Sequence, residues 1–132
     1  MKKTNELGTV NKGFLWEYNG DQLIIQKSLK AGNNRMTFSK SDLEDIINYI
    51  GNEGPAYLGN DVGKLVSGRE KPGIGLFIYE NSEKNLTRAQ YAGHLVAIFL
   101  EQNIIEAHGH SRDLTFVLKR PDYVSFLYKK EA

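Results

Sequence analysis

The residues best suited to metal chemistry are His108 and His110, which flank Gly109 in a polar segment. Side chains at alternate strand positions point the same way, so two imidazoles with this spacing could share an ion. A zinc site needs a third protein ligand, which Asp113 or Glu106 would have to provide. Two histidines around a turn glycine are more often ordinary polar turn residues, so we predict no metal site.

The glycine-rich segment from Gly68 to Gly75 invites comparison with phosphate-binding loops. It lacks both the Gly-x-x-x-x-Gly-Lys-Ser/Thr and the Gly-x-Gly-x-x-Gly patterns that cradle nucleotide phosphates. Arg69 and Lys71 are candidates for sequence-neutral contacts with the phosphates of a nucleic acid. Glu70 beside Lys71 is a single pair rather than a nuclease-like cluster of acids. We therefore predict no catalytic residue and no cofactor.

A helix is predicted to begin at Thr87 and to run to about Gln102. Thr87 and Gln90 have the spacing of a capping box, in which two side chains satisfy backbone N–H groups at the helix start. Most of this helix is apolar. A narrow polar stripe, with Gly93 at its side, consists of Gln90, His94, Ala97 and Glu101.

A hairpin with a polar tip is predicted directly after this helix. Residues 104–107 and 114–118 are runs of strand length, and residues 108–113 between them are polar turn formers. The order of helix, short strand, polar turn and returning strand resembles the C-terminal half of a winged helix-turn-helix domain. The resemblance covers residues 73–119 and is carried by Leu86-Thr87-Arg88-Ala89-Gln90 and the strand entry Glu101-Gln102-Asn103-Ile104-Ile105-Glu106.

The resemblance implies that the helix opened by Thr87 enters the major groove of DNA with its first turn against the base edges. Residues 73–81 would supply the preceding helix. Glutamine can pair with adenine and arginine with guanine, while lysine would contact phosphate. The implied DNA contacts at this helix are Lys84, Asn85, Thr87, Arg88, Gln90 and His94, and those in the wing are His110 and Arg112.

The same helix permits a competing interpretation. Arg88 projects from the side that carries Ala92, Leu95 and Phe99, and an almost wholly apolar helix is typical of a protein interior. It would then be the central core helix of an unrelated α+β fold. On this interpretation His94 is a partly buried helical histidine rather than a general base.

The first part of the chain predicts a loose arm at residues 1–11 and a three-stranded antiparallel meander at 12–38. Asn19-Gly20 separates two β-prone runs and strongly indicates a hairpin, because a type I′ turn needs positive φ at both central residues. One strand face collects aromatic side chains that we expect in the core: Phe14, Trp16 and Tyr18.

Residues 39–51 predict a helix with a capping box of Ser41 and Glu44. One helical face is apolar and is expected to be buried: Leu43, Ile46, Ile47 and Ile50. In the glycine-rich middle of the chain, Asn60 would cap a short helix at 60–66. Residues 76–79 fit a buried strand and a turn of buried helix equally well.

The composition predicts one globular domain over residues 1–132, of the α+β class, with the meander and helix followed by a winged-helix-like half. The chain is 40% hydrophobic and 25% charged, unlike disordered proteins. It has no cysteine, which excludes disulfides and thiolate metal sites. Neither a secretory signal nor an apolar run of about 20 residues is present, so we expect a soluble cytoplasmic protein without a membrane role.

The charge distribution says little about partners. The net charge is +1, and residues 1–40 carry seven Lys/Arg against three acids, which is typical of a solvated face. The leading hypothesis is therefore DNA binding on the strength of the resemblance, as a regulator or as the recognition part of a DNA-processing system. Two alternatives stay open: a protein-interaction module that docks through the meander, and a small metal- or phosphate-dependent enzyme. A homodimer also stays open.

Overall fold

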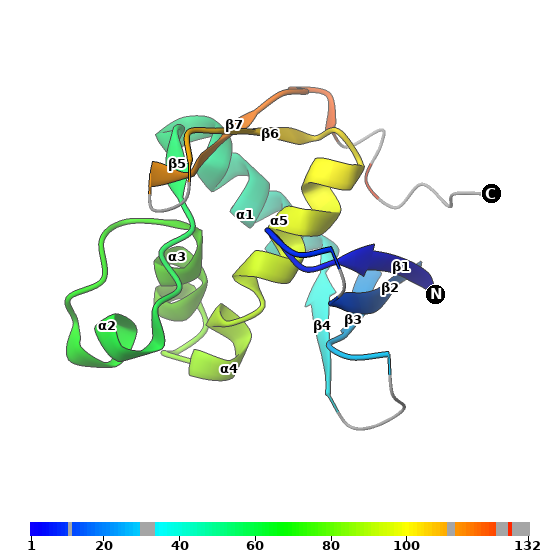
Figure 1. The fold of residues 1–132 in the computed structure, drawn as a ribbon, viewed down its shortest axis with the longest axis horizontal. Coiled ribbons are helices and arrows are strands. Elements are labelled where there is room, and N and C mark those ends of the chain that lie inside the picture. The colour runs from blue at the N-terminus through cyan, green and yellow to red at the C-terminus, as the bar shows by residue number, and fades with distance from the viewer. Residues whose placement is uncertain (11, 30–33, 111–112, 124–126, 128–132) are drawn as a thin grey trace.

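The computed structural model describes residues 1–10, 12–29, 34–110, 113–123 and 127, and it confirms the α+β class (Figure 1). Two antiparallel sheets lie on different sides of a helical layer. In chain order the elements are β1 (Lys2–Asn5), β2 (Gly13–Asn19), β3 (Gln22–Gln26), β4 (Arg35–Ser39), α1 (Lys40–Glu53), β5 (Ala56–Tyr57), α2 (Val62–Ser67), α3 (Ile74–Asn81), α4 (Leu86–Ala89), α5 (Ala92–Glu101), β6 (Ile105–His108) and β7 (Thr115–Leu118).

The N-terminal sheet has four strands in the order β1-β2-β3-β4. The hairpin predicted at Asn19-Gly20 is confirmed, but the residues between paired Asn19 and Gln22 are Gly20 and Asp21, and of these two only Gly20 has a positive φ, 63°. The prediction of a loose arm is wrong for β1, which pairs with β2. The sequence of β1 is wholly polar, so it carries no apolar alternation that would indicate a strand.

One face of this sheet contributes to the core, as the aromatic alternation predicted. Phe14 and Trp16 are buried, and Tyr18 is half-buried. The partner strands add buried side chains on the same face: Leu23, Ile25 and Phe38.

Helix α1 confirms the predicted helix and its apolar face, and the four predicted residues are all buried. The capping box is formed by Ser39 and Asp42 instead of Ser41 and Glu44. The Ser39 hydroxyl accepts a bond from the Asp42 N–H at 3.1 Å, and the Asp42 carboxylate accepts one from the Ser39 N–H at 3.2 Å. The helix therefore starts where the strand β4 ends, without an intervening loop.

Residues 76–79, which fitted a buried strand and a turn of helix equally well, belong to helix α3. This confirms the helix expected over residues 73–81. Asp61, one residue after the predicted Asn60, caps α2. Gly75 is needed where α3 meets the preceding connection, because a Cβ there would lie 2.5 Å from the carbonyl oxygen of Gly59.

The segment expected as one helix from Thr87 to Gln102 is divided into α4 and α5. The capping box predicted for Thr87 and Gln90 is wrong. Asn85 caps α4 instead, and its side-chain oxygen accepts a bond from the Arg88 N–H at 3.0 Å. An asparagine just before the first helical residue outcompetes a threonine already inside the turn.

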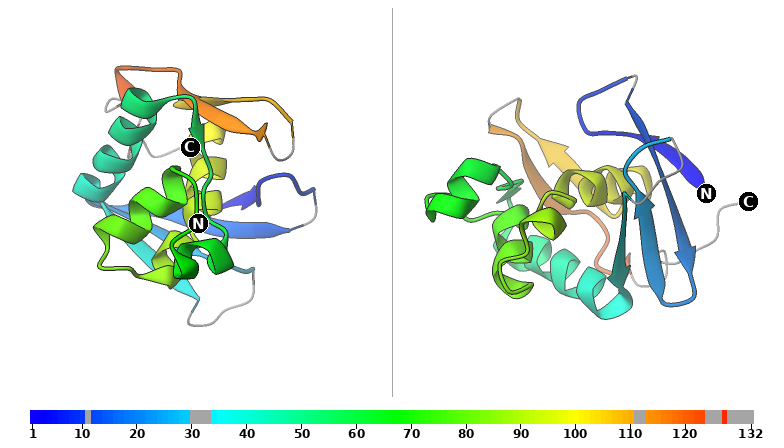
Figure 2. Two further views of the ribbon diagram at one scale, coloured as in Figure 1. Left: turned by 90° about the vertical axis from the view of Figure 1, so that its left-hand side faces the viewer. Right: turned by 90° about the horizontal axis from the view of Figure 1, so that it is seen from below.

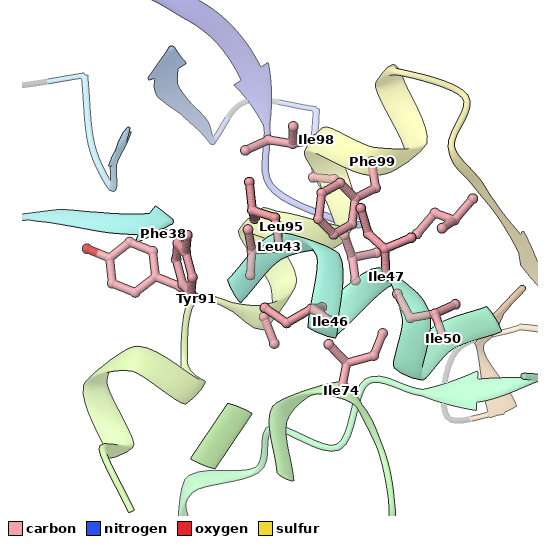
Figure 3. Close-up of a cluster of buried hydrophobic side chains, with 14 of the residues drawn as sticks. Phe38, Leu43, Ile46, Ile47, Ile50, Ile74, Tyr91, Leu95, Ile98 and Phe99 are labelled. Atoms are coloured by element: carbon pink, nitrogen blue, oxygen red, sulfur yellow. The ribbon is translucent and has the colours of Figure 1, made fainter. Parts of the chain in front are cut away.

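Helix α5 lies at the centre of the molecule, between the four-stranded sheet and α3 (Figures 1 and 2). Figure 3 shows Leu95, Ile98 and Phe99 of α5 in the same cluster as residues of α1 and Phe38 of β4. Seven of its ten residues are buried: Ala92, His94, Leu95, Val96, Ala97, Ile98 and Phe99. The helix is thus enclosed, as the competing interpretation predicted.

The second sheet has three antiparallel strands in the order β5-β7-β6. The predicted hairpin is confirmed by the pairing of β6 with β7. Strand β5 was not predicted, because two residues are too few to show a periodicity. In the part of the chain that the structure describes, no helix combines the length and the apolar character needed to cross a membrane.

Candidate functional site

Arg88, the residue expected to contact guanine, is half-buried and engaged in contacts with other parts of the chain. Its guanidinium lies 2.7 Å from a carboxylate oxygen of Asp42 and donates to the carbonyl of Thr37 at 2.9 Å. It also lies 4.1 Å from the centre of the Phe38 ring. The role of Arg88 as a base contact is therefore wrong for this conformation: the side chain fastens α4 to β4 and α1.

His94 is enclosed, with 5% of its surface exposed. The ring of Phe14 meets it edge-on at 4.8 Å, and Tyr91 lies at 5.3 Å. Burial lowers the pKa of His94 and Lys27 adds to this, while the nearby carboxylate of Glu6 acts in the opposite direction. His94 cannot reach a DNA base from here, which corrects its predicted role as a contact.

The polar stripe predicted along this helix is only partly buried: His94 is enclosed, Gln90 is half-buried and Glu101 is exposed. Glu101 accepts a hydrogen bond from Thr4 of β1 and lies 3.8 Å from the Lys2 ammonium. Farther along, Tyr18 donates to Gln102 at 2.8 Å. Two members of the stripe therefore contact the N-terminal segment: His94 lies beside Glu6, and Glu101 contacts β1. Periodicity marks such a stripe but does not say which element covers it.

The predicted contacts in front of α4 are exposed. Lys84, Asn85 and Thr87 lie at the surface, and Gln90 is half-buried. Figure 1 shows α4 at the lower edge of the molecule and the turn ends of β6 and β7 at the upper left, with α3 between them. His110 is exposed at that turn, and Arg112 lies outside the described residues. The structure therefore does not bring α4 and His110 together into one surface.

Lys71, a predicted phosphate contact, comes together with three other residues at the turn end of the three-stranded sheet. Tyr57 of β5 pairs with Thr115 of β7, which pairs with His108 of β6, so the three side chains form one row across the sheet. The Lys71 ammonium lies 4.2 Å above the Tyr57 ring. We call Tyr57, Lys71, His108 and Thr115 the sheet-tip surface. The neighbouring Phe116 points to the other face and is fully buried.

The loop that carries Lys71 is ordered by its own hydrogen bonds. The Glu70 carboxylate accepts bonds from the backbone N–H groups of Asp61 and Lys71, at 2.8 and 2.9 Å. Arg69 is exposed and donates to the Ser67 hydroxyl at 3.1 Å. Lys71 was a candidate phosphate contact from the sequence. Tyr57 and Thr115 were missed, because the two-residue strand β5 that brings Tyr57 beside the predicted hairpin has no signal in the sequence.

Negative charge also lies at the sheet-tip surface. Glu106 is on the same sheet face, and its carboxylate is 3.1 Å from the His108 ring. Within the described ranges no three His, Asp or Glu side chains are grouped closely enough to hold a metal ion.

On the outer face of the four-stranded sheet, the docking surface of one alternative hypothesis, the apolar residues Leu15 and Ile24 are half-buried. The exposed large apolar residues near it, Met1, Val10 and Leu29, lie outside the strands. That alternative stays a prediction.

Comparisons of the chain with protein-family models, with curated proteins and with solved structures found no match.

Proposed function

We propose that this chain binds DNA, and that it does so through the sheet-tip surface rather than through the buried helix α5. The observation that carries the proposal is the row of Tyr57, Thr115 and His108 with the Lys71 ammonium held above the tyrosine ring. It combines a positive charge, a hydroxyl and an imidazole on one face of the sheet, where Lys71 and His108 are exposed and Thr115 is half-buried.

The chemistry of this row suits phosphate contacts. A lysine ammonium provides the sequence-neutral attraction that dominates DNA affinity, and threonine and histidine donate hydrogen bonds to phosphate oxygens. The cation–π contact with Tyr57 restricts the Lys71 side chain, so less conformational entropy is lost on binding. The order of α3, the α4–α5 segment and the β6–β7 hairpin supports the proposal, because a winged helix-turn-helix places a hairpin wing against the DNA backbone.

The experiment is a gel-shift series with a mixed-sequence duplex and the matching single strand at rising salt. Affinity is expected to fall steeply with salt, and Lys71→Ala should reduce the slope of log K against log salt by about one, as the loss of one phosphate contact does. The matched control is Lys3→Ala. Lys3 is an exposed lysine on β1, in the other sheet, and its loss should leave the slope unchanged.

Glu106 gives a second, opposite test. Because its carboxylate shares the sheet face with His108, Glu106→Gln removes a repulsion toward phosphate and should tighten binding. No retardation of either DNA by the wild-type protein, even at low salt, would refute the proposed function. Equal losses for Lys71→Ala and Lys3→Ala would refute the assigned surface.

A further inference from the structure

A second feature of the molecule lies away from the sheet-tip surface. A groove of about 280 Å³ runs between the β1–β2 connection, the residues after β5 and the first turn of α5. We call it the α5 groove. Its lining residues are Glu6, Leu7, Thr9, Lys12, Leu58, Asn60, Gln90, Gly93 and His94.

His94 is the unusual member of this lining. It is 95% buried, and neither ring nitrogen has a hydrogen-bond partner among the described residues. Its Nε2 atom lies 3.3 Å from a Glu6 carboxylate oxygen, so Glu6 is a charged neighbour of the ring at the groove. Buried polar side chains in native proteins are nearly always hydrogen-bonded, and exceptions concentrate at functional sites. The rings of Phe14 and Tyr91 hold the imidazole in this position.

Space at the groove floor is provided by Gly93. A Cβ built on this residue would meet no heavy atom within 4 Å, and its φ is not in the left-handed region. Glycine costs stability in a helix interior, and here neither backbone conformation nor close packing of the protein requires it. The absence of a side chain keeps the groove open beside His94.

The charged residues in the lining of the groove indicate a ligand that carries both a positive and a negative charge. Glu6 would repel a pure anion and Lys12 a pure cation, whereas a molecule with both charges is attracted by both. The amides of Asn60 and Gln90 add donors and acceptors, and Leu7 and Leu58 offer apolar contact. The volume is close to the lower limit of about 300 Å³ for small-molecule sites, which favours a small molecule. A bare metal ion fits less well, because no third metal-binding side chain accompanies His94 and Glu6 within the described ranges.

We propose that the α5 groove binds a free α-amino acid, with its ammonium group at Glu6, beside His94, and its carboxylate at Lys12. This site is independent of the DNA proposal. The amides of Asn60 and Gln90 orient the two charged groups, and the side chain of the amino acid lies against Leu7 and Leu58.

The test uses the full chain with ¹³C/¹⁵N-labelled histidine. Pools of the proteinogenic amino acids at millimolar concentration are added, and the His94 imidazole signals and the melting temperature are followed. We expect a saturable shift of His94 and a rise in melting temperature with at least one pool. For the active amino acid, its amide and its deaminated analogue should each bind at least tenfold more weakly.

Two variants locate the site. Gly93→Leu should fill the groove and abolish the response, while Gly93→Ala checks that α5 tolerates a side chain there. Lys12→Ala should weaken binding at least tenfold, with Lys3→Ala as the matched lysine control. The proposal is overturned if no pool shifts His94, if Lys12→Ala binds like the wild type, or if only zinc chloride produces the response.

Discussion

Replacing Arg88 by alanine is expected to destabilise the fold by about 2 to 3 kcal/mol. The ion pair with Asp42 contributes about 0.5 to 1 kcal/mol, because the Asp42 side chain is 45% exposed and solvent screens the pair. The bond to the Thr37 carbonyl contributes about 1 kcal/mol. The contact with the Phe38 ring adds about 0.5 to 1 kcal/mol.

The assay is urea denaturation followed by circular dichroism. With a slope of about 1 to 3 kcal/mol per molar for a domain of this size, the midpoint should fall by about 1 M. Arg88→Lys keeps the charge but loses the planar fork, so it should give an intermediate midpoint. The matched control is Arg69→Ala, an exposed arginine whose loss should change stability by less than about 0.5 kcal/mol.

The alternative role of Arg88 makes the opposite prediction. If this side chain contacted a base, Arg88→Ala would lower DNA affinity and leave the urea midpoint where it was. That pair of results would refute the assignment of Arg88 to contacts within the fold.

Three further predictions concern the helices around this contact. Leu95→Ala in the fully buried face of α5 should cost about 3 kcal/mol in urea denaturation, whereas Val66→Ala, on an exposed side of α2, should cost almost nothing; equal costs would contradict the central place of α5. Asn85→Ala should lower the free energy of unfolding by about 1 kcal/mol, because α4 loses its N-cap, and Thr87→Ala should lower it clearly less. A larger loss for Thr87→Ala than for Asn85→Ala would instead support the capping box predicted from the sequence. The folded-state pKa of His94 lies below its ordinary value, so the unfolded chain binds more protons as the pH falls through about 6.5. The fold should therefore lose stability on acidification, and His94→Gln should flatten this loss between about pH 7.5 and 5.5 in urea titrations; an unchanged pH profile would contradict the burial of His94.

The elements whose signals are local could be predicted from the amino-acid sequence alone. The apolar face of α1 repeats at helical spacing, Asn19-Gly20 divides two strands, and residues 104–118 alternate around a polar turn. In each case the residues that specify the element lie within a few positions of one another. These elements are where expected, with boundaries shifted by one or two residues at the caps of α1 and α2.

Which segment covers each helix face could not be predicted in this way, because it depends on contacts between distant parts of the chain. The stripe with His94 and Glu101 could be polar because it faces solvent or because it packs against other polar groups. The structure divides it: His94 is buried, whereas Glu101 is exposed and contacts β1. Arg88 likewise found its partners at Thr37 and Asp42, some fifty residues away. Helical periodicity shows which face of a helix is polar. Whether that face is exposed depends on which distant segment packs against it, and the local sequence does not contain this information.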